Sequence, residues 1–181
     1  MCEETDFFSK NPGSGLGCFV VHTRPRVEKK AAELASSLGR PVFLPLYEKP
    51  QQRRSGRGRV RHYRTRFPLF PGYLFARLTA EDVKNERLRA HVAGMIPVTA
   101  LEEPVLLRQL QQVKTALEGP YTLEPYEYLK TGATVSVSMG PLKGLEGYVV
   151  CHKDRQTFVV QVDLVGRAVS IDVDAALLRV L

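Results

Sequence analysis

The sequence has no tryptophan, and its three cysteines, Cys2, Cys18 and Cys151, form no CxxC pair. An odd number of scattered thiols does not build a disulfide framework or a thiolate metal site, so we expect a reducing cytoplasm as the location. No apolar run reaches the roughly 20 residues of a membrane-spanning helix, and we expect no membrane association. Residues 1–17 lack the apolar segment of a signal peptide and are expected to form a flexible leader.

The residues that usually carry catalysis are also sparse. The four histidines, His22, His62, His91 and His152, lack the spacing of metal ligands. No carboxylate pair or nucleophile–base motif is apparent in the sequence. The sequence therefore predicts a protein that is not an enzyme and that uses no cofactor or metal ion.

Acidic residues are scarce at the N-terminal end. The first 80 residues carry 15 Lys and Arg against 6 Asp and Glu, while the whole chain has a net charge of +7. From Arg53 to Arg66 there are seven arginines and neither a lysine nor an acid. The guanidinium fork suits phosphate recognition, so this arm predicts contact with nucleic acid. A solvated surface loop would explain the same composition.

The patterning of residues 18–118 predicts a mixed domain of short strands and helices. The expected elements are a strand at 18–22, a helix at 26–38, a strand at 41–47, a loose hairpin with sides 46–52 and 60–68, a strong strand at 69–78 bent at Pro71-Gly72, a helical segment at 80–89, a weak strand at 93–99 and a helix that starts at 102–104. The last helix has a core-facing stripe of Leu106, Leu110, Val113 and Leu117.

From residue 119 onward the helical periodicity is lost and short β-type segments follow. Residues 119–131 hold two prolines and little helical period, and we interpret them as a linker that lets the two domains move independently. Residues 132–181 contain four or five short β-branched strands, with Gly166-Arg167 as a tight turn. The predicted fold class is α+β, with an N-terminal α/β sandwich followed by a small all-β barrel.

A glycine-rich segment lies between two of these strands. Gly140, Gly144 and Gly147 follow a short spacing around Lys143, but the Gly-Lys-Ser/Thr ending of a Walker A loop is missing. A simple strand connection would explain the spacing. In its context between strands the segment resembles a KOW motif, the mark of small SH3-like barrels, and Gly166 and Arg167 fit the same pattern downstream.

Together with the upstream half, this motif resembles the NusG family of transcription elongation factors. The resemblance covers residues 18–181 and is carried by Phe19-Val20-Val21, the helix from Arg26, Phe43-Leu44-Pro45, Leu69-Phe70-Pro71-Gly72-Tyr73-Leu74-Phe75 and the KOW ending. It implies a flexible leader (1–17), an NGN-like domain (18–118), a linker (119–131) and a KOW domain (132–181).

The resemblance also implies a binding site for RNA polymerase. In this family the N-terminal domain docks an apolar patch on the clamp helices of the largest polymerase subunit and suppresses pausing. Carried onto this sequence, the patch would consist of Phe70, Tyr73 and Phe75, with Phe19 and His22 as neighbours. Aromatic residues on one face of a strand would equally fill the domain core.

For nucleic acid, the implied partner is non-template DNA in the transcription bubble. The residues expected to contact it are Arg53, Arg54, Arg57, Arg59 and Arg61, with Arg24, Arg26 and Lys29 as extensions of the surface. The alternative from another class is an RNA-binding KOW protein of the ribosome or its assembly. That alternative would leave the concentration of charge in the other domain unexplained.

Two features bear on the branch of the family and on its partners. Residues 24–29 and 44–47 look like the specialised paralogues RfaH, UpxY and LoaP, which antiterminate in particular operons. In generalists the position of Val165 is often aromatic and lies in the surface that binds a ribosomal protein or the termination factor Rho, so a valine argues against both partnerships. We expect a monomer whose C-terminal domain is a resident β-barrel, because its valines favour strand.

Overall fold

The N-terminal region is built on an antiparallel four-stranded sheet in the order β2-β5-β1-β6. The computed structural model describes residues 7–9, 15–54, 60–126, 132–152 and 155–181. The strands of this sheet are β1 (Gly17–Thr23), β2 (Val42–Phe43), β5 (Tyr73–Leu78) and β6 (Val92–Pro97). β1 pairs with β5 on one side and with β6 on the other.

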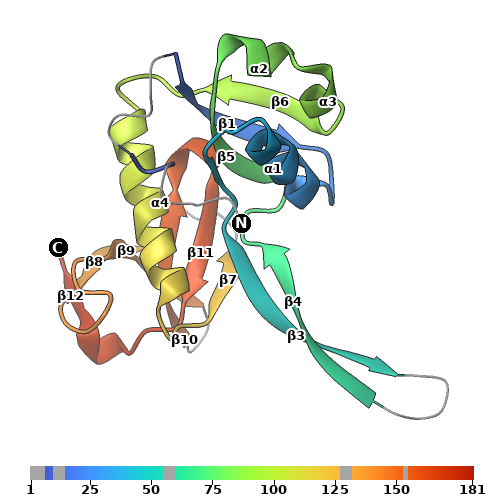
Figure 1. Ribbon diagram of the computed structural model, residues 1–181. Helices are drawn as coiled ribbons and strands as arrows, with labels where there is room; N and C mark the ends of the chain where they lie inside the picture. The colour runs from blue at the N-terminus through green and yellow to red at the C-terminus, as the bar shows by residue number, and fades with distance from the viewer. Residues whose placement is uncertain (1–6, 10–14, 55–59, 127–131, 153–154) are drawn as a thin grey trace.

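Both faces of this sheet are apolar, because successive side chains of a strand point to opposite faces. Val21 and Leu74 belong to one core cluster, which includes buried residues of α1 and α3. Val20 and Phe75 belong to another, which includes the buried stripe of α4. The helices are α1 (Glu28–Ser37), α2 (Ala80–Lys84), α3 (Glu86–Arg89) and α4 (Glu103–Glu118). Figure 1 shows α4 apart from the other three helices.

The helix starts follow local capping chemistry. At α2, Thr79 and Asp82 form a reciprocal capping box. Burial raises the pKa of Asp82. The hydrogen bonds from Thr79 and the ion pair with Arg40, at 2.7 Å, lower it by more, so the net pKa lies below the ordinary value of 3.8. Ahead of α4, Thr99 and Glu102 exchange the same kind of bonds, which fixes the helix start where the sequence predicts it.

The arginine arm forms a hairpin of its own, as predicted. β3 (Leu46–Arg54) and β4 (Val60–Pro68) pair antiparallel from Leu46↔Pro68 to Arg54↔Val60 and make a separate two-stranded sheet. Figure 1 shows this hairpin projecting away from the rest of the molecule. Both of its faces are therefore open to solvent along most of its length.

The C-terminal region is a six-stranded antiparallel sheet in the order β12-β8-β9-β10-β11-β7, which we call the C-terminal sheet. Its strands are β7 (Leu123–Tyr126), β8 (Ala133–Val137), β9 (Glu146–His152), β10 (Arg155–Val162), β11 (Arg167–Ile171) and β12 (Leu178–Val180), with short 3-10 helices η2 (Asp163–Val165) and η3 (Ala175–Leu177). The α+β fold class is confirmed, and this all-β region is consistent with the predicted SH3-like barrel.

One glycine of the predicted KOW motif has a clear packing reason. A Cβ on Gly147 would lie 2.5 Å from the carbonyl oxygen of Val159 and 2.8 Å from the ring of Phe158. β9 and β10 can therefore approach each other only because residue 147 has no side chain.

The structure differs from expectation where the two regions meet. Within the segment interpreted as a linker, Leu123–Tyr126 forms β7 and pairs with β11. The core cluster that holds Phe75 and Leu110 also holds Val162 and Val169 of the C-terminal sheet. In this arrangement the two regions share a continuous core through α4.

The leader also differs at the residues that the structure describes. Phe7 is fully buried, and its ring lies 6.0 Å from Phe43 and 5.2 Å from Phe8, centroid to centroid. Its carbonyl oxygen accepts a hydrogen bond from Nε of the buried Arg77, at 3.2 Å. This part of the leader is packed into the core. Among the described residues, no helix combines the length and apolarity that crossing a membrane would take.

Candidate functional site

His22 and Tyr73 form a stacked pair at the end of the N-terminal sheet. They face each other in the β1–β5 register, and their ring centroids lie 4.9 Å apart with an interplanar angle of 17°. His22 is exposed and Tyr73 is half-buried. The pair therefore offers an aromatic surface with polar groups, a composition that protein interfaces favour.

The turn before Tyr73 is held from several sides. Gly72 has φ of +83°, which favours glycine, and its N–H donates to Oε1 of the buried Glu28 at 2.9 Å. The carbonyl oxygen of Gly72 accepts from the N–H of Thr23 at 2.8 Å, and the N–H of Tyr73 donates to the carbonyl oxygen of Phe70 at 3.0 Å. These bonds fix the position of Tyr73 from β1 and from α1.

The other three residues of the predicted patch lie elsewhere. Phe70 and Phe75 are almost completely buried and meet edge-on, with ring centroids 6.1 Å apart. Phe75 shares its strand face with Tyr73 but lies deeper, where the core cluster with Phe7 and α4 covers it. Phe19 is half-buried in the cluster on the opposite face of the sheet. In this arrangement they do not lie beside Tyr73 in one exposed patch, because strand alternation and core packing separate them.

The C-terminal sheet contacts the stacked pair. The guanidinium carbon of Arg167, at the start of β11, lies 5.9 Å from the centroid of the Tyr73 ring, within reach of a cation–π interaction. Nearby, Gln109 of α4 donates to Oδ2 of Asp163 at 2.6 Å and accepts from the Asp163 N–H at 3.1 Å. These contacts hold the turn between β10 and β11 beside α4.

The predicted basic residues spread over two elements. Arg61 is exposed on β4, Arg53 and Arg54 close the β3 strand, and Arg57 and Arg59 lie outside the described residues. Arg24 and Arg26 are exposed ahead of α1, and Nζ of Lys29 donates to the carbonyl oxygen of Arg66 at 2.6 Å. Lys29 thus ties α1 to the base of the hairpin.

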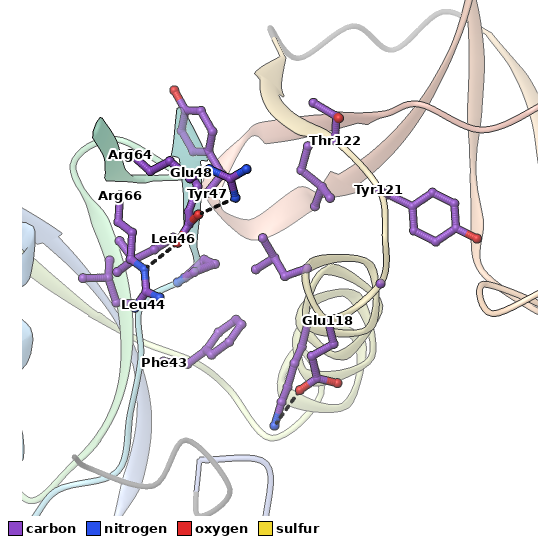
Figure 2. Close-up of a pocket in the computed structure, with 15 residues that line it drawn as sticks. Phe43, Leu44, Leu46, Tyr47, Glu48, Arg64, Arg66, Glu118, Tyr121 and Thr122 are labelled. Atoms are coloured by element: carbon purple, nitrogen blue, oxygen red, sulfur yellow. Dashed lines mark hydrogen bonds and ion pairs between the residues drawn. The ribbon is translucent and has the colours of Figure 1, made fainter. Parts of the chain in front are cut away.

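A cavity of about 520 Å³ opens between the base of the hairpin and the C-terminal end of α4. Figure 2 shows Glu48 held between Arg64 and Arg66, whose nitrogens lie 3.6 Å and 3.1 Å from its carboxylate oxygens. The hydrogen bond from Arg66 holds the pKa of Glu48 below its ordinary value. At the other wall Lys114 pairs with Glu118. On each wall of the cavity the charged side chains therefore pair with one another.

The residues predicted for the KOW motif are distributed along the C-terminal sheet. Gly140 and Gly144 have positive φ in the connection between β8 and β9, Lys143 there is exposed, and Gly166 takes a left-handed conformation directly before Arg167. Val165, the position tied to partner choice, is buried in the core cluster. Of the predicted motif only Gly147 is buried, and Lys143 and Arg167 are its exposed charged side chains.

Metal-binding groups do not gather in the described part of the chain. There, no cluster of three or more His, Cys, Asp or Glu residues could hold a metal ion. Cys18 is buried, and burial raises the pKa of its thiol to about 11, against the opposing effect of Arg77. A thiol with this pKa stays protonated at neutral pH and is a poor nucleophile.

Sequence reasoning missed the polar contacts that organise the core. Arg77 is 1% exposed and donates from Nη1 to Glu103 at 2.5 Å, which joins β5 to the first turn of α4. One signal was available, since Arg77 is the single charge in the apolar strand Tyr73–Leu78. Nothing in the sequence pattern indicated the hydrogen bonds between Gln109 and Asp163.

The chain matches the sequence model of a known protein family. The sequence model of the family described as "Transcription termination factor nusG" matches residues 18–128. No curated protein is significantly similar in sequence. The match spans the N-terminal sheet, the hairpin, α4 and β7, which is more than half of the chain. The chain therefore belongs to the NusG family of transcription factors.

Proposed function

We propose that this protein binds RNA polymerase through the N-terminal domain, on the clamp helices of the largest subunit, and that the stacked pair of His22 and Tyr73 is the centre of the docking surface. The observation that carries the proposal is the accessible stack on a rigid turn, in a domain of the NusG family. Bound there, the protein suppresses pausing and promotes antitermination, as a specialised RfaH-, UpxY- or LoaP-like member acting in the cytoplasm as a monomer.

The arginine hairpin supplies the second contact of the proposal, with non-template DNA in the transcription bubble. It projects from the domain and carries the exposed Arg61. The C-terminal sheet, proposed as a KOW domain, recruits a further partner. Burial of Val165 supports a surface different from the one that generalists use for a ribosomal protein or Rho.

Docking on Tyr73 competes with the contact from Arg167. The guanidinium lies over the same ring that the polymerase would cover. Removing this side chain leaves the ring free and is expected to strengthen binding. An exposed cation–π contact contributes about 0.5–1 kcal/mol, so Arg167→Ala should raise the affinity by roughly two- to fivefold.

The test is binding of the full chain to the cognate core polymerase in the absence of nucleic acid. We compare the wild type with Tyr73→Ala and His22→Ala. Tyr148→Ala is the matched control, since Tyr148 is a half-buried tyrosine on β9 of the C-terminal sheet. Loss of binding in the first two variants alone supports the proposed surface. Equal binding by folded Tyr73→Ala and wild type would overturn it. A single-round transcription assay of pause lifetime tests the elongation role separately.

A further inference from the structure

The hairpin of β3 and β4 has two chemically different faces, and we propose that one of them binds single-stranded nucleic acid by stacking an unpaired base on Tyr63. The inference rests on the proposed function for the idea that the hairpin contacts nucleic acid. It adds the face, the stacking residue and the single-stranded class of ligand.

The register of the hairpin defines the two faces. Tyr63 is opposite Gln51, and Thr65 is opposite Lys49. Because residues two apart on a strand share a face, Arg61, Tyr63 and Thr65 lie on one side together with Lys49 and Gln51. We call this side the Tyr63 face.

Tyr63 is a large aromatic side chain that does not pack into a core cluster of the described residues. It is 46% exposed, and the described residues give its ring no aromatic or hydrogen-bonding partner. Tyr47, on the same face nearer the base, shows the contrast, since it packs against Phe67 with ring centroids 6.0 Å apart. An unpartnered ring on an open strand surface is what a stacking platform for a base requires.

The charges on the Tyr63 face are positive and free of acids. Lys49 and Arg61 are both exposed, and each lies about 7 Å from Tyr63 along or across the strands. Cations on both sides of an aromatic ring match a strand whose phosphates flank a base. The described residues of this face contribute no carboxylate.

The opposite face is less suited to phosphate. There, Glu48 lies between Arg64 and Arg66 and pairs with both of them, as Figure 2 shows. The two guanidinium groups are already engaged, and the carboxylate would repel a phosphate placed beside them. The remaining described side chains of that face include Gln52 and His62, with no aromatic ring free to stack other than the imidazole.

Single-stranded nucleic acid fits the Tyr63 face better than a duplex does. In a duplex the faces of the bases are already stacked on one another, so a base would have to unpair before it could cover Tyr63. The hairpin projects into solvent, so a nucleic-acid strand can lie along it without meeting the body of the protein. Every base has a π-face, and we expect little preference for base identity.

The first experiment measures affinity of the full chain for a 12-nucleotide oligo-dT, an oligo-U of the same length and a DNA duplex, without polymerase. Tyr63→Ala should weaken binding to the single strands by about tenfold, while Tyr63→Phe keeps the affinity within about twofold. Salt dependence separates stacking from charge. Tyr63→Ala leaves the slope of log affinity against log salt unchanged, whereas Arg61→Gln lowers it by about 0.7. His62→Ala, on the opposite face, is the control and should bind as the wild type does.

The second experiment uses the absence of tryptophan from the chain. Tyr63→Trp introduces a single fluorophore at the proposed platform, and His62→Trp places one on the opposite face. Stacking of a base on the indole should quench the first and leave the second nearly unchanged. Quenching by both oligo-dT and oligo-U assigns the site to single strands in general, and quenching by one assigns it to DNA or to RNA.

The inference is overturned if Tyr63→Ala binds oligonucleotides as tightly as the wild type, or if His62→Trp is quenched in place of Tyr63→Trp. Preferential binding of the duplex would also overturn it. Because polymerase is absent from these measurements, their failure leaves the docking surface around Tyr73 untouched. Loss of polymerase binding by Tyr73→Ala would in turn leave the oligonucleotide result unaffected.

Discussion

Replacing Glu103 by glutamine should destabilise the protein far more than its position near the surface suggests. Glu103 neutralises Arg77, whose side chain is 1% exposed, through a contact of 2.5 Å. Without that carboxylate the guanidinium loses its counter-charge; among the described residues it keeps the carbonyl oxygen of Phe7, at 3.2 Å, and the contact with the Phe7 ring. Nη2 of Arg77 already has no hydrogen-bond partner among the described residues.

The magnitude follows from the burial of the pair. Removing one partner of a buried ion pair typically costs about 3–5 kcal/mol, because the remaining charge is left uncompensated. The Glu103 side chain is 28% exposed, so water can reach part of the site and we expect about 2–4 kcal/mol. For a chain of this size that corresponds to a fall in Tm of roughly 5–15 °C.

The assay is urea and thermal unfolding of the wild type, Glu103→Gln, Arg77→Met and the double variant. Removing both charges spares the cost of an unpaired guanidinium, so the double variant should be more stable than Glu103→Gln alone. The control is Glu118→Gln on the same helix, because the Glu118 side chain is 66% exposed and its ion pair with Lys114 should contribute less than about 0.5 kcal/mol. Glu103→Gln and Glu118→Gln of equal stability would refute the reasoning.

Two further predictions concern packing and pH. Gly147→Ala should destabilise the protein by about 1–3 kcal/mol in urea unfolding, because the new methyl group meets the backbone of Val159 and the ring of Phe158. The control is Gly94→Ala, which should change stability by less than about 0.5 kcal/mol because no atom lies within 4 Å of its Cβ. The depressed pKa of Asp82 contributes stability that is complete above the unfolded pKa and is lost as the pH falls through the lower folded value. Acid titration below about pH 5 should therefore show a smaller loss of stability for Asp82→Asn than for the wild type, and parallel curves would contradict this assignment.

Local patterns predicted the elements well where one periodicity dominates. The stripe of α4 follows from helical spacing, and the structure buries Leu106, Leu110 and Val113 of it, with Ala116 in place of Leu117. The expected hairpin is present as β3 and β4. The helix expected at 26–38 ends earlier in the structure, at Ser37. Leu38 lies past the last helical residue and is 37% exposed, while Ala35 occupies the buried position.

Contacts between distant segments could not be predicted, because they depend on how elements pack. Burial of Phe7 requires the ring of Phe43 and the guanidinium of Arg77, which lie far along the chain. The same holds for the candidate site, where strand alternation separates Phe19 from His22 and core packing removes Phe75 from the surface. A list of aromatics in sequence order cannot distinguish a core residue from an exposed one on the same strand.

The shared core decides how a partner could reach Tyr73. Separating the C-terminal sheet from α4 would expose Leu110, Val162 and their neighbours in the core cluster, and burial of each such side chain is worth about 1.5–3 kcal/mol. Moving Arg167 to another rotamer gives up only an exposed cation–π contact of about 0.5–1 kcal/mol. For the proposed docking the cheaper route is therefore local: the polymerase would displace one side chain while the C-terminal sheet stays on α4. On this reasoning, cross-linking Gln109 to Asp163 through paired cysteines should leave polymerase binding intact, and loss of binding in the cross-linked protein would show that the sheet must leave.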